Sequence, residues 1–144
     1  MSNNKPIQLG LCCLNTQLRA QKPSIFASRK MIIRTIEEKG INCLKEKIIQ
    51  NLKDILVMMD WNENNGIKVF RLSSELFPHK SNPKVLDYEY DFAIDLLDKI
   101  GEKSKLYNQR LTFHPGQYNV IGSPNINTFN QTCADLKYHA DVLD

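Results

Sequence analysis

The chain has 144 residues, of which 42% are hydrophobic and 24% are charged, and its formal net charge is +3. This length fits one domain, and the composition is close to that of soluble globular proteins, which excludes a disordered or fibrous chain. No apolar run approaches the roughly 18 residues that span a bilayer, and the first residues lack the apolar segment of a signal peptide. We therefore expect an intracellular, soluble protein without a membrane partner.

The cysteine pattern indicates reduced thiols. Cys12 and Cys13 are adjacent, and Cys43 and Cys133 lie in helical patterns outside any C-x-x-C or Cys/His zinc spacing. Neighbouring residues of a strand point to opposite faces, so Cys12 and Cys13 cannot bind one metal ion together.

Basic residues are concentrated near the N-terminus, where none is opposed by an acidic residue before Glu37. They are Lys5, Arg19, Lys22, Arg29, Lys30 and Arg34. Such a segment is either an ordinary solvated surface or a surface that binds polyanions, and charge alone does not distinguish the two.

The first half of the chain predicts a strand and two helices. Residues 7–12 form a short apolar run typical of a buried strand, and the polar stretch 15–28 follows as a loop. A short helix is possible over 28–39, ending near Gly40. The spacing of Leu44, Ile48, Leu52, Ile55, Leu56 and Met59 predicts a helix over 43–64 with one apolar face.

The second half continues the alternation of strands and helices. Residues 67–72 form a compact apolar run that predicts a strand, and residues 110–113 form the third predicted strand. The stripe of Tyr88, Phe92, Leu96 and Ile100 predicts a helix over 86–106. A last helix begins after Asn125, a good N-cap residue. Its expected apolar stripe consists of Phe129, Cys133, Leu136, Ala140 and Leu143.

This order of three strands, each followed by a helix, predicts an α/β fold with a parallel sheet. Helices then cover both faces of the sheet, which explains strands that are continuous apolar runs. Functional groups in such folds gather where the parallel strands end.

Three polar residues follow the three strand ends. His114 comes directly after 110–113, where a neutral imidazole could bind a divalent metal or act as an acid or base. Glu75 follows 67–72 and could share such an ion, or simply cap a turn or pair with Arg71. Asn15 could hydrogen-bond a ligand or form a local Asx turn.

The loop after His114 offers groups suited to nucleic acid. Gln117 and Tyr118 place an amide beside an aromatic ring, which can hydrogen-bond and stack on a base, although Tyr118 could instead close the loop against the last helix. His79 reads as a loop residue and His139 as an exposed helix position.

Three segments together resemble one known family. They are 9–15 (LGLCCLN), 70–78 (FRLSSELFP) and 111–118 (LTFHPGQY), the last followed by GSP at 122–124. In this order and combination they resemble the UV damage endonucleases, and the resemblance covers nearly the whole chain.

The resemblance implies a TIM-type (β/α) barrel that cuts damaged double-stranded DNA on the 5′ side of ultraviolet photoproducts, using divalent metal ions such as Mn, Mg or Zn. It implies that His114 is a metal ligand, that Glu75 occupies a metal-site position where relatives can carry histidine, and that Gln117 and Tyr118 contact the lesion. Asn15 would line the site, and activated water would attack phosphorus. The basic stretch would hold phosphates.

A complete barrel has eight strands in about 250 residues, whereas this chain supplies three strands. We therefore expect residues 1–144 to be the N-terminal portion of such a barrel, an incomplete domain that is inactive unless a complementary chain supplies the rest. The alternative is a catalytically inert fragment that binds DNA or a partner. A fragment of a metal-dependent sugar isomerase-like barrel is a third interpretation, because that architecture also places His and Glu at strand ends.

Overall fold

The computed structural model describes residues 7–85 and 87–144 and is built around one parallel sheet. Its strands are β1 (Gly10–Cys12), β2 (Val69–Leu72) and β3 (Arg110–Phe113), in the spatial order β1-β2-β3. Both strand pairs are parallel, as the alternation of strands and helices predicted. The bounds of β3 agree with the prediction, whereas β1 and β2 begin a few residues late.

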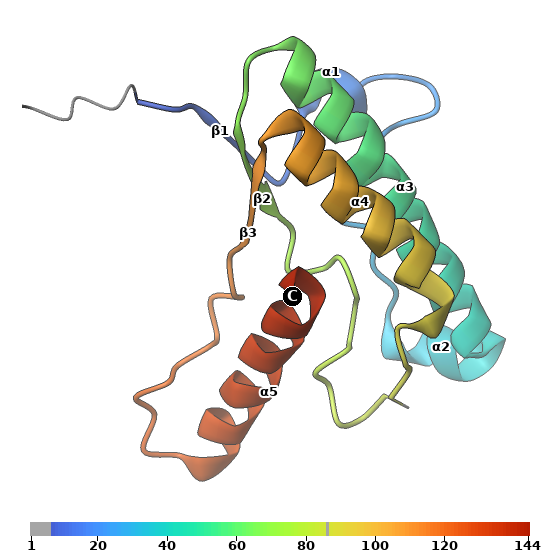
Figure 1. The fold of residues 1–144 in the computed structure, drawn as a ribbon. Helices are drawn as coiled ribbons and strands as arrows, with labels where there is room; N and C mark the ends of the chain where they lie inside the picture. Colours follow the sequence, from blue (N-terminus) through green and yellow to red (C-terminus); the bar gives the residue numbers. More distant parts are fainter. Residues whose placement is uncertain (1–6, 86) are drawn as a thin grey trace, which may run out of the picture.

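Two long helices lie against the sheet on one side, and a third contacts the end of β3. The helical elements are α1 (Thr16–Arg19), α2 (Ile33–Lys39), α3 (Ile41–Asn64), η1 (Asp91–Ala93), α4 (Ile94–Tyr107) and α5 (Ile126–Leu143). Figure 1 shows α3 and α4 side by side next to the strands, with α5 beyond the strand ends. In the described part of the chain, no helix is both long and apolar enough to cross a membrane.

The core lies between the sheet and α3. Phe70 and Leu72 of β2 are buried, as are Leu44, Ile48, Leu52, Ile55 and Met59 of α3. These α3 residues recur at helical spacing, so one face of the helix packs on the sheet. The apolar stripe predicted for this helix is confirmed, except that Leu56 is only partly buried.

The prediction that helices cover both sheet faces is wrong for the described residues. Val69 and Arg71 of β2 alternate with the buried Phe70 and Leu72, so they lie on the opposite face of the sheet. Their register partners on that face, Gly10, Cys12 and Arg110, are exposed. Ile7 and Leu9, expected in a buried strand, are 94% and 74% exposed and lie just before β1. An apolar run therefore predicted the strand correctly but not the burial of its start.

Helix α2 is shorter than predicted because α3 binds the backbone at its expected start. The side chain of Asn51, fully buried in α3, accepts a hydrogen bond from Arg29 N at 2.9 Å and donates one to Arg29 O at 3.0 Å. A backbone engaged in this way cannot make helical hydrogen bonds. The helix expected from residue 28 therefore begins at Ile33.

Helix α4 also begins later than predicted. The expected start, residue 86, lies outside the described residues, and the segment from Asp87 leads through the 3-10 turn to Ile94. The Tyr88 hydroxyl donates to Pro78 O at 2.8 Å, and Tyr88 is buried. Tyr88 was assigned to the apolar stripe of this helix, but it is buried in the loop that precedes the helix.

Helix α5 begins where predicted, but it buries a different face from the one predicted. Asn125 caps it, because its side chain accepts from the backbone N–H groups of Asn127 and Thr128. Its predicted core stripe is wrong, since Phe129 and Leu143 are 38% and 45% exposed. The residues that α5 buries are Thr132, Tyr138 and His139.

Candidate functional site

The C-terminal ends of the three strands lie next to one another. Cys12 is in register with Arg71, and Arg71 with Thr112, so the loops that follow the strands leave from the same edge of the sheet. Asn15, Glu75 and His114 therefore come from adjacent loops at this rim, as the sequence predicted. In parallel α/β sheets this edge carries the functional groups.

Asn15 shapes the backbone at the end of β1. Its Oδ1 accepts from Leu18 N at 3.0 Å and caps α1, and its side chain is buried. Asn15 therefore has a local structural role, as an N-cap rather than in the Asx turn that the sequence suggested. Its Nδ2 is also buried, and it has no hydrogen-bond partner among the residues that the structure describes.

Glu75 lies in a turn that α3 holds from behind. Asn51 Nδ2 is 3.4 Å from Glu75 O and 3.3 Å from Leu76 O, and Glu75 N donates to Ser73 Oγ at 3.2 Å. The side chain of Glu75 is half-buried and lines a cavity. Within residues 7–85 and 87–144 it makes no ion pair with Arg71, so that alternative is wrong.

His114, Gln117 and Tyr118 are exposed in the loop after β3. Asn119 N donates to Gly116 O at 3.1 Å, which closes a turn with Gln117 and Tyr118 at its corner. Tyr118 is 82% exposed, so it does not close the loop against α5. Its ring is free to stack on a partner from outside the described chain.

The loops after β2 and β3 border an open cavity of about 460 Å³. Its lining includes Glu75, His79, Gly116, Tyr118 and Asp135, whereas His114 lies outside it. The structure therefore brings Glu75 together with the Tyr118 loop. In the described chain, no three His, Cys, Asp or Glu side chains form a group that could hold a metal ion.

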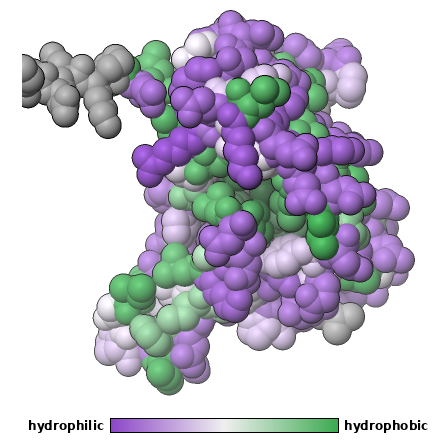
Figure 2. Space-filling model, in the orientation of Figure 1, coloured by the Kyte–Doolittle hydropathy of each residue, from purple (hydrophilic) through white to green (hydrophobic). Residues whose placement is uncertain are grey.

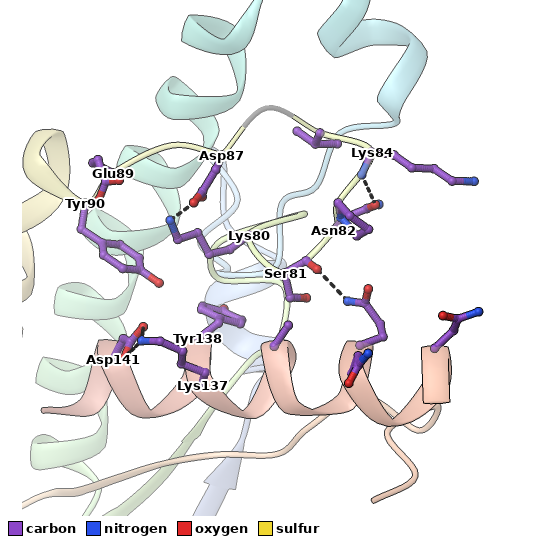
Figure 3. A pocket seen from close by; sticks show the side chains of 16 residues that line it. Lys80, Ser81, Asn82, Lys84, Asp87, Glu89, Tyr90, Lys137, Tyr138 and Asp141 are labelled. Carbon is purple, nitrogen blue, oxygen red and sulfur yellow. Dashed lines mark hydrogen bonds and ion pairs between the residues drawn. The ribbon is translucent and has the colours of Figure 1, made fainter. Parts of the chain in front are cut away.

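A larger open cavity of about 1180 Å³ adjoins the first. It lies between the segment from Lys80 to Tyr90 and α5, and Lys80, Ser81 and Tyr138 border both cavities (Figure 3). Lys80 and Lys137 in its wall are paired with Asp87 and Asp141. These ion pairs leave the wall without a strong excess of charge.

The contribution of α5 to this rim was not expected from the sequence. His139, expected to be exposed, is only 5% exposed. Its ring centroid lies 4.6 Å from that of Phe113 and 4.4 Å from that of Tyr138. Burial lowers the pKa of His139, and the nearby Asp135 partly offsets this effect. The spacing of Asp135, Tyr138 and His139 on one helix face could have indicated that this face is buried. The opposite face was predicted instead, because its residues are more apolar.

Apolar side chains gather where the loop after β3 meets α5. Figure 2 shows this cluster at the lower left, and its most exposed members are Val120, Ile121 and Ile126 at 48%, 63% and 65%. Together with Tyr118, which is also exposed, they follow one another closely along the chain.

The basic stretch is only partly free to bind phosphates. Arg29 forms an ion pair with buried Asp54 at 2.7 Å and lies over the ring of Phe26, and Arg34 is paired with Glu38. Arg19, Lys22 and Lys30 are exposed, and Lys5 lies outside the described residues. The prediction that the whole stretch serves phosphates is therefore wrong for Arg29, which has a structural role.

The fold and rim define an α/β protein with a candidate site at the C-terminal ends of parallel strands. The family model of UV-endonuclease UvdE matches residues 7–144. The chain is 42% identical to a putative UV-damage endonuclease of Acanthamoeba polyphaga mimivirus, over 99% of this chain and 43% of the viral protein. It is 41% identical to the UV-damage endonuclease of Schizosaccharomyces pombe, over 97% of this chain and 24% of that protein.

The crystal structure of SacUVDE is similar to this fold with a TM-score of 0.80 and 29% sequence identity, over 96% of this chain and 45% of that chain. The chain therefore belongs to the UV-endonuclease UvdE family. Its fold is a partial TIM-type barrel of three β/α units, as the resemblance predicted. The chain spans less than half the length of these relatives.

Proposed function

We propose that this chain forms the lesion-binding part of a metal-dependent endonuclease that acts on DNA at ultraviolet photoproducts. One observation carries the proposal: the loops containing 70–78 and 111–118, which mark the family in the sequence, leave adjacent ends of β2 and β3 and border one cavity. The activity named for the relatives requires DNA as substrate, and the exposed Tyr118 at this rim suits contact with a base.

In this proposal, His114 and Glu75 are metal ligands. An imidazole nitrogen and a carboxylate are suitable donors for a divalent ion, and a bound ion would stabilise negative charge on the scissile phosphate. Two ligands hold an ion weakly, and the described residues supply no group of three. The donors therefore fit only part of a metal site, and further ligands must come from elsewhere in the complete barrel.

Gln117 and Tyr118 are proposed to contact the damaged duplex. The closed turn from Gly116 to Asn119 projects both side chains into solvent, where an amide can hydrogen-bond a base edge and a phenol ring can stack on it. Asn15 is proposed to line the same site, because it follows β1 at the same rim and its Nδ2 has no hydrogen-bond partner among the described residues.

Calorimetric titration with Mn²⁺ tests the ligand assignment. His114→Ala and Glu75→Gln should each weaken Mn²⁺ binding, whereas Glu89→Gln, which changes an exposed glutamate elsewhere, should not. Equal affinity in all three variants would contradict the assignment.

We further propose that the chain needs a complementary polypeptide to cut DNA, because its described residues do not complete a metal site. An incision assay on irradiated duplex, with and without a candidate C-terminal half, tests this. Efficient incision by the chain alone would refute the requirement. Binding to irradiated DNA without incision under either condition would favour the second candidate function, a catalytically inert DNA-binding module.

A further inference from the structure

One face of α5 holds the loop that carries Tyr118. Asn119 Nδ2 donates to Asp135 Oδ2 at 2.5 Å, and Val120 N donates to Thr132 Oγ1 at 3.0 Å. Thr132 is 2% exposed, so the second bond is shielded from water. The backbone directly after Tyr118 is therefore attached to a rigid helix.

The same face of α5 also holds the segment after β2. Ser81 Oγ donates to Asp135 Oδ1 at 3.0 Å, and Gln131 Nε2 donates to Ser81 O at 2.7 Å. Figure 3 shows Ser81 directed toward α5 across the edge of the cavity. Further along the helix, the Tyr138 hydroxyl accepts from Phe77 N at 3.2 Å.

Asp135 therefore joins the two rim loops through one carboxylate. One oxygen accepts from the loop after β2 and the other from the loop after β3. Hydrogen bonds to an ionised carboxylate are stronger than those between neutral groups. The carboxylate is mostly shielded, with 19% of the side chain exposed, so water competes weakly for it.

We propose that Asp135 is a positioning residue for recognition of the DNA lesion. Through Asn119 it fixes the turn from Gly116 to Asn119, so that Gln117 and Tyr118 project from the rim in one orientation. A side chain whose backbone is already ordered loses less conformational freedom on binding, which strengthens the contact it makes. This inference rests on the proposed function, because it acts through the contact between Tyr118 and the damaged base.

The test measures the lesion preference of the full chain, defined as the Kd for undamaged duplex divided by the Kd for the same duplex after irradiation. Asp135→Ala removes the bridge, and Asn119→Ala breaks it from the loop side while leaving α5 intact. Asp141→Ala is the matched control, because it removes an exposed carboxylate from the same helix. Tyr118→Ala reports the proposed contact itself.

We expect Asp135→Ala and Asn119→Ala each to lower the lesion preference about 2- to 10-fold, the cost of ordering a side chain on binding. Asp135→Asn, which keeps an acceptor oxygen, should recover part of the loss. In a Tyr118→Ala background, Asp135→Ala should have no further effect, because two residues that act through one contact are not additive. Amide hydrogen exchange at Val120 should also accelerate in Asp135→Ala, with or without DNA.

Two failures are distinguishable. If Tyr118→Ala lowers the preference while Asp135→Ala and Asn119→Ala behave like Asp141→Ala, the positioning role is overturned and the proposed function stands. If Tyr118→Ala keeps the full preference, the proposed lesion contact fails and the positioning role falls with it. An additive loss in the double variant would also overturn positioning through Tyr118.

Discussion

Tyr138→Phe should destabilise the fold, because the hydroxyl of Tyr138 connects α5 to the loop after β2. The hydroxyl accepts from Phe77 N at 3.2 Å and donates to Ser74 O at 3.3 Å, and the side chain is 4% exposed. Phenylalanine keeps the ring and its packing but leaves the buried Phe77 N–H without a partner.

The magnitude follows from these two bonds. An unsatisfied buried donor costs about 1–3 kcal/mol, and Ser74 O, which is only partly buried, can find water instead. We therefore expect a loss of about 2 kcal/mol in the free energy of unfolding. For a chain of this size that corresponds to a Tm lower by about 4–8 °C.

Urea unfolding followed by circular dichroism measures this loss, with Tyr118→Phe as the control. Tyr118 is 82% exposed, so removing its hydroxyl should change stability by less than about 0.5 kcal/mol. If the two substitutions have the same small effect, the Tyr138 hydroxyl does not anchor α5 to the loop after β2.

Three further substitutions test other parts of the structure. Asp54→Ala should cost about 3–5 kcal/mol in urea unfolding, because it leaves the charge of Arg29 partly buried and unpaired, whereas Glu38→Ala at an exposed pair should cost less than about 1 kcal/mol. Asn125→Ala should cost about 0.5–2 kcal/mol, because it removes the cap of α5, and restoration of stability by Asn125→Ser would support that cause. The pKa of His139 is lowered in the folded chain, so the unfolded chain binds the proton more readily. The free energy of unfolding should therefore fall as pH drops below about 6.5. His139→Phe should flatten this part of the stability–pH profile, and an unchanged slope would contradict the prediction.

Local patterns determined the elements of this protein. β3 was predicted at its observed bounds because a strand-like segment ends where His114 and Pro115 interrupt it. The α3 stripe and the Asn125 cap were also readable, since helical spacing and capping depend on residues within one or two turns. The parallel order followed from the alternation of strands and helices, and the three family segments pointed to the correct family.

Tertiary contacts decided which surfaces these elements bury. The apolar stripe of α5 faces outward because Asp135 and Tyr138 on its other face hydrogen-bond to the two rim loops. His139 on that face packs against Phe113 at the end of β3, and a pattern within one helix cannot show where its partners lie. The late start of α2 has the same origin, since the Asn51 side chain that binds the Arg29 backbone is distant in sequence. Sequence therefore determined the strands, most helices and the rim residues, while long-range hydrogen bonds determined how the rim loops are held.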